Sequence, residues 1–318
     1  MTRRKGAVKL RLMAPSTVRQ NPARRYVIAG QPVEAPALAA GLHIVATPIG
    51  NLGDITLRAL ETLAAANVIA CEDTRVTRKL LDRYGIGTPL TPYHEHNATE
   101  ARPKLLARLE AGQSIALVSD AGTPLVSDPG FKLVRAAREA GHAVTALPGA
   151  SAALAALSIA ALPTDRFFFE GFLPPKETAR RARLTEIRRL PATLILFETG
   201  PRLAATLADL AAVLGPREAA ICRELTKLHE EVRRGPLAAL AAHYAKGEAP
   251  RGEIVIVIAP PPEEKPPEVG ELDDLLRHAL DRGSVKDAVS EVADATGLPR
   301  RDIYQRALAL EKDKGEGR

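Results

Sequence analysis

Residues 115–130 read IALVSDAGTPLVSDPG, and this stretch is the clearest indication of the fold. It begins with an apolar run, 115–119, and passes directly into a loop that contains Asp120, Gly122 and Pro124. Proline and glycine favour tight turns, and glycine also lets a ligand approach the main chain closely. The stretch is therefore typical of a buried parallel strand that ends in a ligand-binding loop.

Apolar runs of the same kind recur along the chain, with amphipathic segments such as 55–65 and 98–110 between them. The first series of runs is 42–47, 68–71, 115–119 and 143–147, and a second series is 166–171, 193–198, 218–223 and 253–259. Strands that are apolar almost throughout and alternate with helices indicate a parallel sheet covered on both faces. The sequence predicts two α/β domains.

The remaining segments differ from these domains in composition. Eight of the 44 Lys and Arg residues lie within 1–33, which has no Asp or Glu, so the basic charge of +6 belongs to a leader. Residues 260–267 are rich in proline and predict a stiff linker. The predicted parts are a basic, disordered leader (1–40), an N-terminal α/β domain (41–163), a second α/β domain (164–260), a linker (261–270) and a helical appendage (271–318).

Two cysteines, Cys71 and Cys222, are too few and too far apart to form a disulfide framework. We find no apolar segment long enough to span a bilayer and no secretory signal, and we expect a cytoplasmic protein without a membrane partner. The basic leader suggests contact with nucleic acid, although a solvated tail explains it equally well.

Three loops that follow predicted strands, 46–54, 119–130 and 147–152, combine glycine with proline or aspartate. None has the spacing of a dinucleotide fingerprint, and no P-loop motif occurs in the sequence. The loops have almost no Lys or Arg, so they suit a ligand with little negative charge. S-adenosylmethionine, which carries a cationic sulfonium and no phosphate, fits this description.

Five motifs carry a resemblance to known proteins: TPIGNLGDIT (47–56), CEDTR (71–75), LVSDAGTPLVSDPG (117–130), LPGASA (147–152) and EGFLP (170–174). The chain resembles the tetrapyrrole-methylase-like superfamily, and within it the branch that methylates a cytidine 2′-hydroxyl in the decoding region of small-subunit ribosomal RNA. The likeness runs from about residue 41 to 260 and continues into the C-terminal helices. One position departs from the pattern, because the motif that ends in Arg202 lacks the histidine usual in the family.

The resemblance implies a homodimer that binds S-adenosylmethionine in the cleft between its two α/β domains and acts on small-subunit rRNA or the 30S subunit. The donor contacts that it implies are Pro48, Gly50, Asp120, Ala121, Gly122, Thr123, Pro148, Gly149, Ala150 and Ser151. Asp120 can accept a hydrogen bond from a ribose hydroxyl or from the ammonium group of the donor.

Methyl transfer to a ribose hydroxyl requires a proton acceptor near the reacting oxygen. The candidates are Glu72, Asp73, His94, Glu95, His96, Glu198 and Glu224. Arg75 and Lys227 are candidates for lowering the hydroxyl pKa or for holding an RNA phosphate, although Arg75 can equally pair with Asp73. The sequence does not rank them, and it predicts no metal site, because the two histidines lack a third ligand at metal spacing.

Two segments suggest RNA contacts. A predicted helix after the EGFLP motif carries Lys176, Arg180, Arg181, Arg183, Arg188 and Arg189, although a solvated face is an equal explanation. In the appendage, a helix capped by Ser284 runs to Thr296, and a second helix begins with Arg300 and Arg301, which is helix–turn–helix spacing. These segments favour an RNA substrate over one alternative, a methyltransferase acting on a tetrapyrrole or diphthine. The intact donor loops argue against the other alternative, a non-catalytic RNA-binding or ribosome-assembly factor.

Overall fold

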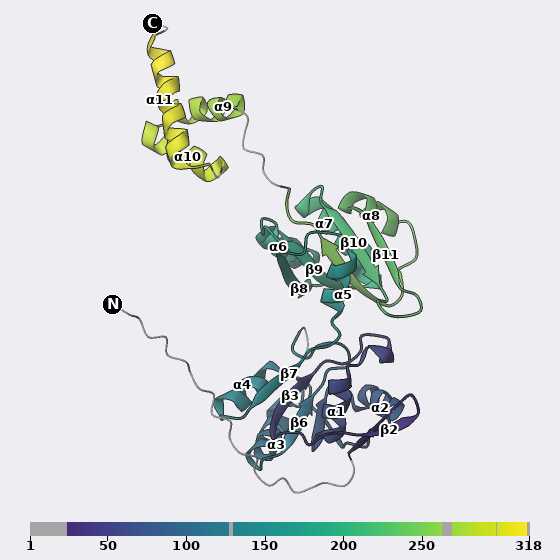
Figure 1. The fold of residues 1–318 in the computed structure, drawn as a ribbon. Coiled ribbons are helices and arrows are strands. Elements are labelled where there is room, and N and C mark those ends of the chain that lie inside the picture. Colours follow the sequence, from purple (N-terminus) through teal and green to yellow (C-terminus); the bar gives the residue numbers. More distant parts are fainter. Residues whose placement is uncertain (1–23, 127–129, 263–268, 297, 317–318) are drawn as a thin grey trace, which may run out of the picture. The chain divides into compact units, whose positions relative to one another are not determined.

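The computed structural model describes residues 24–126, 130–262, 269–296 and 298–316. By its internal contacts the chain divides into two compact units, 1–261 and 262–318, and each is described here by itself. The first unit contains two five-stranded sheets, and the second unit is helical (Figure 1).

The first sheet has the strand order β5-β4-β6-β3-β7, and every pairing in it is parallel. Its strands are β3 (Gly41–Val45), β4 (Val68–Cys71), β5 (Leu90–Pro92), β6 (Ser114–Leu117) and β7 (Val144–Leu147). The predicted parallel sheet is confirmed, and β5 is a short strand that the sequence did not reveal. All five strands end at the same edge, so the loops that follow them gather there.

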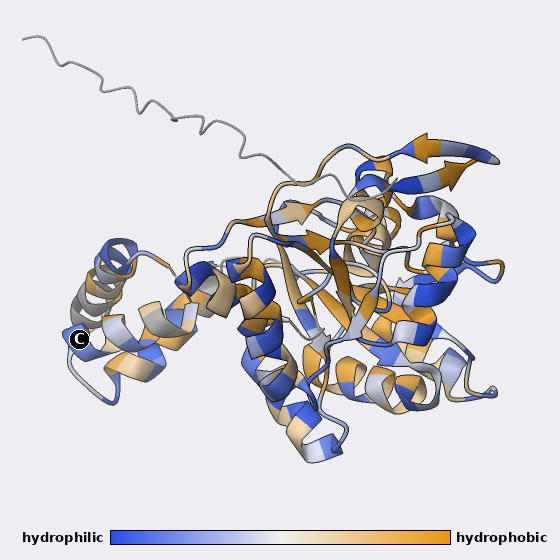
Figure 2. Cartoon of the chain, turned by 90° about the horizontal axis from the view of Figure 1, so that it is seen from below, coloured by the Kyte–Doolittle hydropathy of each residue, from blue (hydrophilic) through white to orange (hydrophobic). Residues whose placement is uncertain are grey.

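Alternate side chains of a strand point to opposite faces of the sheet. Because these strands are apolar almost throughout, both faces are apolar, and helices cover both. Ile69 packs with α1 (Leu57–Ala65) and α2 (Thr74–Arg83), whereas Ala70 packs with α3 (Ala98–Glu110) and α4 (Phe131–Glu139). A short 3₁₀ turn (Leu52–Asp54) precedes α1. Figure 2 shows the apolar residues concentrated on the strands and on the helix faces that cover them.

The predicted disordered leader (1–40) includes residues that are ordered in the structure. Residues 25–34 form an antiparallel hairpin of β1 (Arg25–Ile28) and β2 (Gln31–Glu34). Tyr26 is buried in the same core as α1, and the Val27 amide donates to the Tyr84 carbonyl at 2.8 Å. The prediction is wrong for this segment because tertiary packing orders it, and residues 1–23 lie outside the described part of the chain.

The second sheet is mixed, with the order β11-β10-β12-β9-β8. Its strands are β8 (Phe167–Phe172), β9 (Thr193–Thr199), β10 (Glu218–Arg223), β11 (Glu231–Pro236) and β12 (Glu253–Ile258). Only β8 and β9 pair in parallel; the other three pairings are antiparallel. Helices do lie between the four strands predicted for this domain, but the sequence did not reveal β11, into which β10 turns directly back, or the antiparallel pairings.

Three helices, α6 (Glu177–Ile187), α7 (Gly200–Leu214) and α8 (Leu237–Tyr244), pack on one face of the second sheet. The helix α5 (Ala152–Ile159) covers the other face, where Ala156 is buried with Ile195 and Val257. The change from one sheet to the other thus falls before residue 152. The predicted boundary at Pro163 is late, because the Ala-rich helix before it packs with the second domain.

The C-terminal unit consists of α9 (Val269–Leu280), α10 (Val285–Thr296) and α11 (Arg300–Glu316). One side chain from each helix, Leu276, Val292 and Ile303, is buried in a core of its own. Ser284 caps α10 as predicted, since its hydroxyl accepts from the Asp287 amide at 3.3 Å. Residues 263–268 of the predicted linker lie outside the described residues.

Candidate active site

The three glycine-containing loops meet at the carboxyl edge of the first sheet and are joined by hydrogen bonds. Thr47 and Gly122 exchange two backbone hydrogen bonds of 2.8 and 3.0 Å. The Thr123 hydroxyl donates to the Ala150 carbonyl at 3.1 Å. The loops that the sequence singled out therefore form one connected surface, although residues 127–129 of the second loop lie outside the described part.

A cavity of about 380 Å³ lies between this surface and the second domain. Five of the predicted donor contacts line it: Asp120, Ala121, Gly122, Thr123 and Ser151. The other residues around it are Ile49, Val126, Ala152, Phe172, Phe197, Glu198, Thr199, Leu225, Gly252, Glu253, Ile254 and Val255. Its volume is within the range of small-molecule sites.

The cavity is not lined by the other five predicted donor contacts, which are Pro48, Gly50, Pro148, Gly149 and Ala150. Gly149 packs so closely that a Cβ there would lie 2.7 Å from the Cβ of Ala46. A Cβ on Gly50 would lie 2.5 Å from Cγ of Lys227. The structure therefore gives these two glycines a supporting role, in which they let neighbouring segments come close.

The cavity suits a ligand that carries positive charge and no phosphate. No Lys, Arg or His is among the described residues that line it, whereas Asp120, Glu198 and Glu253 are. Gly122 has φ = +75°, a conformation that glycine adopts without strain, and a Cβ there would lie 3.3 Å from Ile49. The acidic lining and the bare backbone at Gly122 fit S-adenosylmethionine, whose sulfonium and ammonium groups are cationic.

Glu198 is held too firmly to be the proton acceptor. Its side chain is 1% exposed, and Oε2 accepts from the Thr206 hydroxyl at 2.7 Å. Oε1 accepts from the Thr199 amide at 2.8 Å and lies 3.3 Å from Nε of Arg202. Both oxygens are therefore occupied, and the carboxylate anchors the start of α7. The candidacy of Glu198 as a base is corrected to a structural role.

Asp73 and Arg75 form an ion pair, which is the alternative that the sequence left open for Arg75. Arg75 Nη2 lies 2.6 Å from Asp73 Oδ2, and the Asp73 carboxylate also accepts from the Arg75 amide at the start of α2. The side-chain and backbone hydrogen bonds from Arg75 lower the pKa of Asp73 to about 2. A carboxylate with so low a pKa is a poor proton acceptor at neutral pH.

Glu72, Asp73 and Asp120 meet because β4 and β6 are neighbours in the sheet. The Asp73 amide donates to Asp120 Oδ1 at 3.0 Å. Burial raises the pKa of Glu72, and the charge of Asp120 raises it further. Of these three residues, Asp120 lines the cavity, whereas Glu72 and Asp73 are not among its lining residues.

His94 and His96 follow β5, and their ring centroids are 6.0 Å apart. Nδ1 of His94 is buried without a hydrogen-bond partner among the described residues. In this part of the chain no group of three His, Cys, Asp or Glu side chains is arranged to hold a metal ion. Neither histidine lines the cavity.

Lys227, in the loop between β10 and β11, contacts Glu253 of the cavity wall. Its Nζ donates to Glu224 Oε1 at 2.8 Å and to Glu253 Oε2 at 2.6 Å. Burial lowers the pKa of Lys227, but the hydrogen bonds to Glu224 and Glu253 outweigh this effect and raise it overall. Lys227 is therefore protonated at neutral pH.

Sequence reasoning missed most of the second-domain wall, including Thr199, Leu225, Gly252 and Glu253. The predicted sites lay at the carboxyl ends of strands, whereas Gly252 and Glu253 lie at the amino end of β12. They reach the cavity because β12 runs antiparallel to β9, with Glu253 opposite Thr199. The signals for this wall in the sequence were the EGFLP motif, which includes Phe172, and the candidate residue Glu198.

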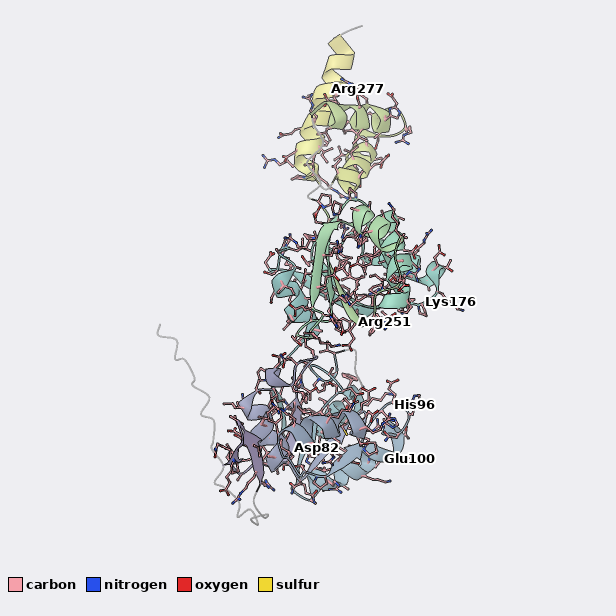
Figure 3. The ribbon with its side chains drawn as sticks, turned by 90° about the vertical axis from the view of Figure 1, so that its right-hand side faces the viewer. Asp82, His96, Glu100, Lys176, Arg251 and Arg277 are labelled. Carbon is pink, nitrogen blue, oxygen red and sulfur yellow. The ribbon has the colours of Figure 1, made fainter. Side chains whose placement is uncertain are left out.

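The arginine helix α6 is largely exposed, but the three arginines on it that were predicted to contact RNA all form ion pairs. Arg180 is buried and pairs with Asp209, Arg181 pairs with Asp209 and Glu177, and Arg183 pairs with Glu170 and Glu186. Arg180 is thus corrected to a structural residue, and the charges of the other two are matched by acidic partners. Lys176 extends from the surface (Figure 3) and stays a predicted RNA contact.

Comparison with known families and structures agrees with this architecture. The family model for tetrapyrrole (corrin/porphyrin) methylases matches residues 41–241, and a model for the RsmI C-terminal HTH domain matches 266–311. A protein of Mesorhizobium japonicum named ribosomal RNA small subunit methyltransferase I is 54% identical over 90% of this chain and 97% of its own length. A Synechocystis protein of the same name is 48% identical over 86% of this chain and 99% of its own length.

Solved structures share the fold at low sequence identity. Diphthine synthase matches 69% of this chain and 89% of its own with a TM-score of 0.54 and 18% identity. A uroporphyrin-III C-methyltransferase from Thermus thermophilus, determined with S-adenyl homocysteine, matches 68% of this chain and 96% of its own with a TM-score of 0.50 and 21% identity.

The two sheets and the acidic, glycine-lined cavity between them define a two-domain α/β methyltransferase whose methyl donor is S-adenosylmethionine. The chain belongs to the tetrapyrrole methylase family.

Proposed function

We propose that this enzyme transfers a methyl group from S-adenosylmethionine to the 2′-hydroxyl of a cytidine in the decoding region of small-subunit rRNA. The observation that carries the proposal is the extent of the likeness to proteins named ribosomal RNA small subunit methyltransferase I. It spans both α/β domains and, through the match at 266–311, the C-terminal helices. Methylation of a small tetrapyrrole does not require a helical appendage.

The loops at the edge of the first sheet hold the donor. S-adenosylmethionine supplies a methyl group that its sulfonium makes electrophilic. Gly122 leaves room for the ligand, Asp120 retains Oδ2 for a hydroxyl or ammonium group, and Ser151 lies at the start of α5. The main task of the protein is to hold the ribose oxygen in line with the methyl group, which can supply about 7–11 kcal/mol of the barrier reduction.

The helical unit binds the RNA substrate, either as free rRNA or within the 30S subunit. Arg301, in the first turn of α11, is exposed, and Arg300 beside it bonds to the Ser290 hydroxyl. Basic residues at the start of the second helix of such a pair are suited to phosphate contacts.

The enzyme acts as a homodimer in the cytoplasm. Strands β7 and β8 are sheet edges in the described part of the chain. Exposed apolar side chains include Phe167 on β8 and Leu154 and Ile159 on α5. Exposed edges with apolar neighbours favour association. No helix among the described residues is long and apolar enough to cross a membrane.

Mass spectrometry of small-subunit rRNA from cells with and without the gene tests the proposal. The expected result is one ribose methyl group on a decoding-region cytidine that disappears with the gene and returns with the intact chain. An unchanged rRNA modification pattern contradicts the proposal. Light scattering of the purified protein tests the dimer.

A further inference from the structure

The loop between β10 and β11 (residues 224–230) joins the two domains at the cavity. Glu224 and Thr226 have φ of +52° and +66°, which is unfavourable for residues other than glycine. The Thr226 hydroxyl accepts from the Asn51 amide of the first domain at 3.1 Å. Such strain persists only where the surroundings enforce it, and it concentrates at functional sites.

This loop holds the carboxylate of Glu253 at the cavity mouth. Glu224 Oε1 accepts from the Glu253 amide at 3.0 Å, and Lys227 Nζ donates to Glu253 Oε2 at 2.6 Å. Gly252, with φ = +99°, allows this approach, because a Cβ there would collide with the carboxyl group of Glu224. Both the main chain and the side chain of Glu253 are thereby positioned.

The carboxylates that line the cavity in the described part of the chain are Asp120, Glu198 and Glu253. Glu198 has both oxygens occupied, and Asp120, which belongs to the loop 119–130, accepts from the Asp73 amide. Glu253 is 73% exposed, and its Oε1 has no partner among the described residues. Lys227 and Glu224 of the loop contact Glu253. The other charged groups around it are Arg251, two residues earlier, Arg223, which is paired with Ile254 of β12, and the carboxylates of Asp120 and Glu198, which line the same cavity.

We propose that Glu253 is the catalytic base that takes the proton of the ribose 2′-hydroxyl, and that Lys227 is its positioning residue. The inference rests on the proposed function. The O–H bond breaks and its proton moves to Glu253 Oε1, while the ribose oxygen uses an electron pair to bond the methyl carbon. The carbon–sulfur bond breaks, and its electron pair stays on sulfur.

Single-turnover methylation by the intact chain, with saturating small subunits from cells that lack the gene, tests the base. We expect Glu253→Gln to lower the rate at neutral pH by on the order of 100-fold or more. We expect the wild-type rate to fall toward acid pH, and we expect this fall to be absent in the variant. Donor affinity is measured by calorimetry, and the donor is supplied at saturation, so that any change in donor binding is separated from the change in rate.

Glu218→Gln is the matched control, because Glu218 is exposed at the opposite end of the same sheet, at the start of β10. It should methylate like wild type. The inference is overturned if Glu253→Gln keeps the wild-type rate or if its rate still falls toward acid pH as in wild type. If wild type itself does not methylate the subunit, the proposed function fails, which is a distinguishable result.

Lys227→Met and Lys227→Arg test the positioning role. Removal of the ammonium group should lower kcat more than it raises the KM for RNA, and Lys227→Arg should restore part of kcat because it again donates to Glu253. An effect of Lys227→Met on KM alone would show that Lys227 holds RNA, and would overturn its assignment as a positioning residue.

Discussion

Arg180 of α6 and Asp209 of α7 form an ion pair in which the two side chains are 6% and 3% exposed, with Nη2 and Oδ2 2.5 Å apart. Arg180 also donates to the Pro175 carbonyl at 3.1 Å. Arg181 contacts the other oxygen of Asp209 at 2.6 Å but is 51% exposed. The pair therefore joins two helices inside the second domain.

Arg180→Ala should lower the free energy of unfolding by about 3–5 kcal/mol, because it leaves the buried Asp209 without its main partner. Arg181→Ala should cost less than about 1 kcal/mol, since water replaces an exposed guanidinium. Urea unfolding of the two variants measures the difference. If both variants lost the same free energy of unfolding, burial would not determine how much each ion pair with Asp209 stabilises the fold.

Gly122→Ala should weaken donor binding. The change introduces strain at φ = +75° and places a Cβ 3.3 Å from Ile49 at the cavity wall. Gly112→Ala is the matched control, because Gly112 has φ = +73° and a Cβ there would meet no other atom within 4 Å. Each variant should lose about 1 kcal/mol of stability. Calorimetry with S-adenosylmethionine should show lower affinity for Gly122→Ala alone, and equal affinities would refute the site.

The pKa of Asp73 should be about 2, and it should rise toward 3.8 in Arg75→Ala, which removes the guanidinium. Because the pKa is lowered in the folded state, Asp73 stabilises the fold above the unfolded pKa. That contribution is lost as pH falls from about 4 through 2. Carboxyl-carbon NMR titration measures the shift, and Arg83→Ala, at the other end of α2, should leave it unchanged.

Removal of residues 262–318 should leave donor affinity intact, because the cavity is built from the first unit. RNA binding should weaken, and the slope of log affinity against log salt should become shallower by roughly 0.7 for each phosphate that the shortened protein no longer neutralises. Filter binding at several salt concentrations measures both quantities. An unchanged affinity and slope would exclude the helical unit as the RNA-binding part.

Local signals in the sequence predicted four of the five strands of the first sheet and the loops that follow three of them. The apolar run at 68–71 coincides with β4, the helix expected over 98–110 coincides with α3, and Ser284 caps α10. Apolar periodicity, turn residues and caps act over a few residues, so they are readable without the fold. The parallel direction of these strands then placed their loops at one edge.

Tertiary structure alone decided the second wall of the site and the role of α6. Glu253 lies at the cavity because β12 is antiparallel to β9, and Arg180 is buried because α7 brings Asp209, 29 residues away, against α6. Strand direction and ion pairing between distant segments depend on how the chain returns on itself. An apolar run in the sequence is the same whether its strand is parallel or antiparallel to its neighbour. The sequence of an arginine-rich helix likewise does not show which distant acidic residues pair with it.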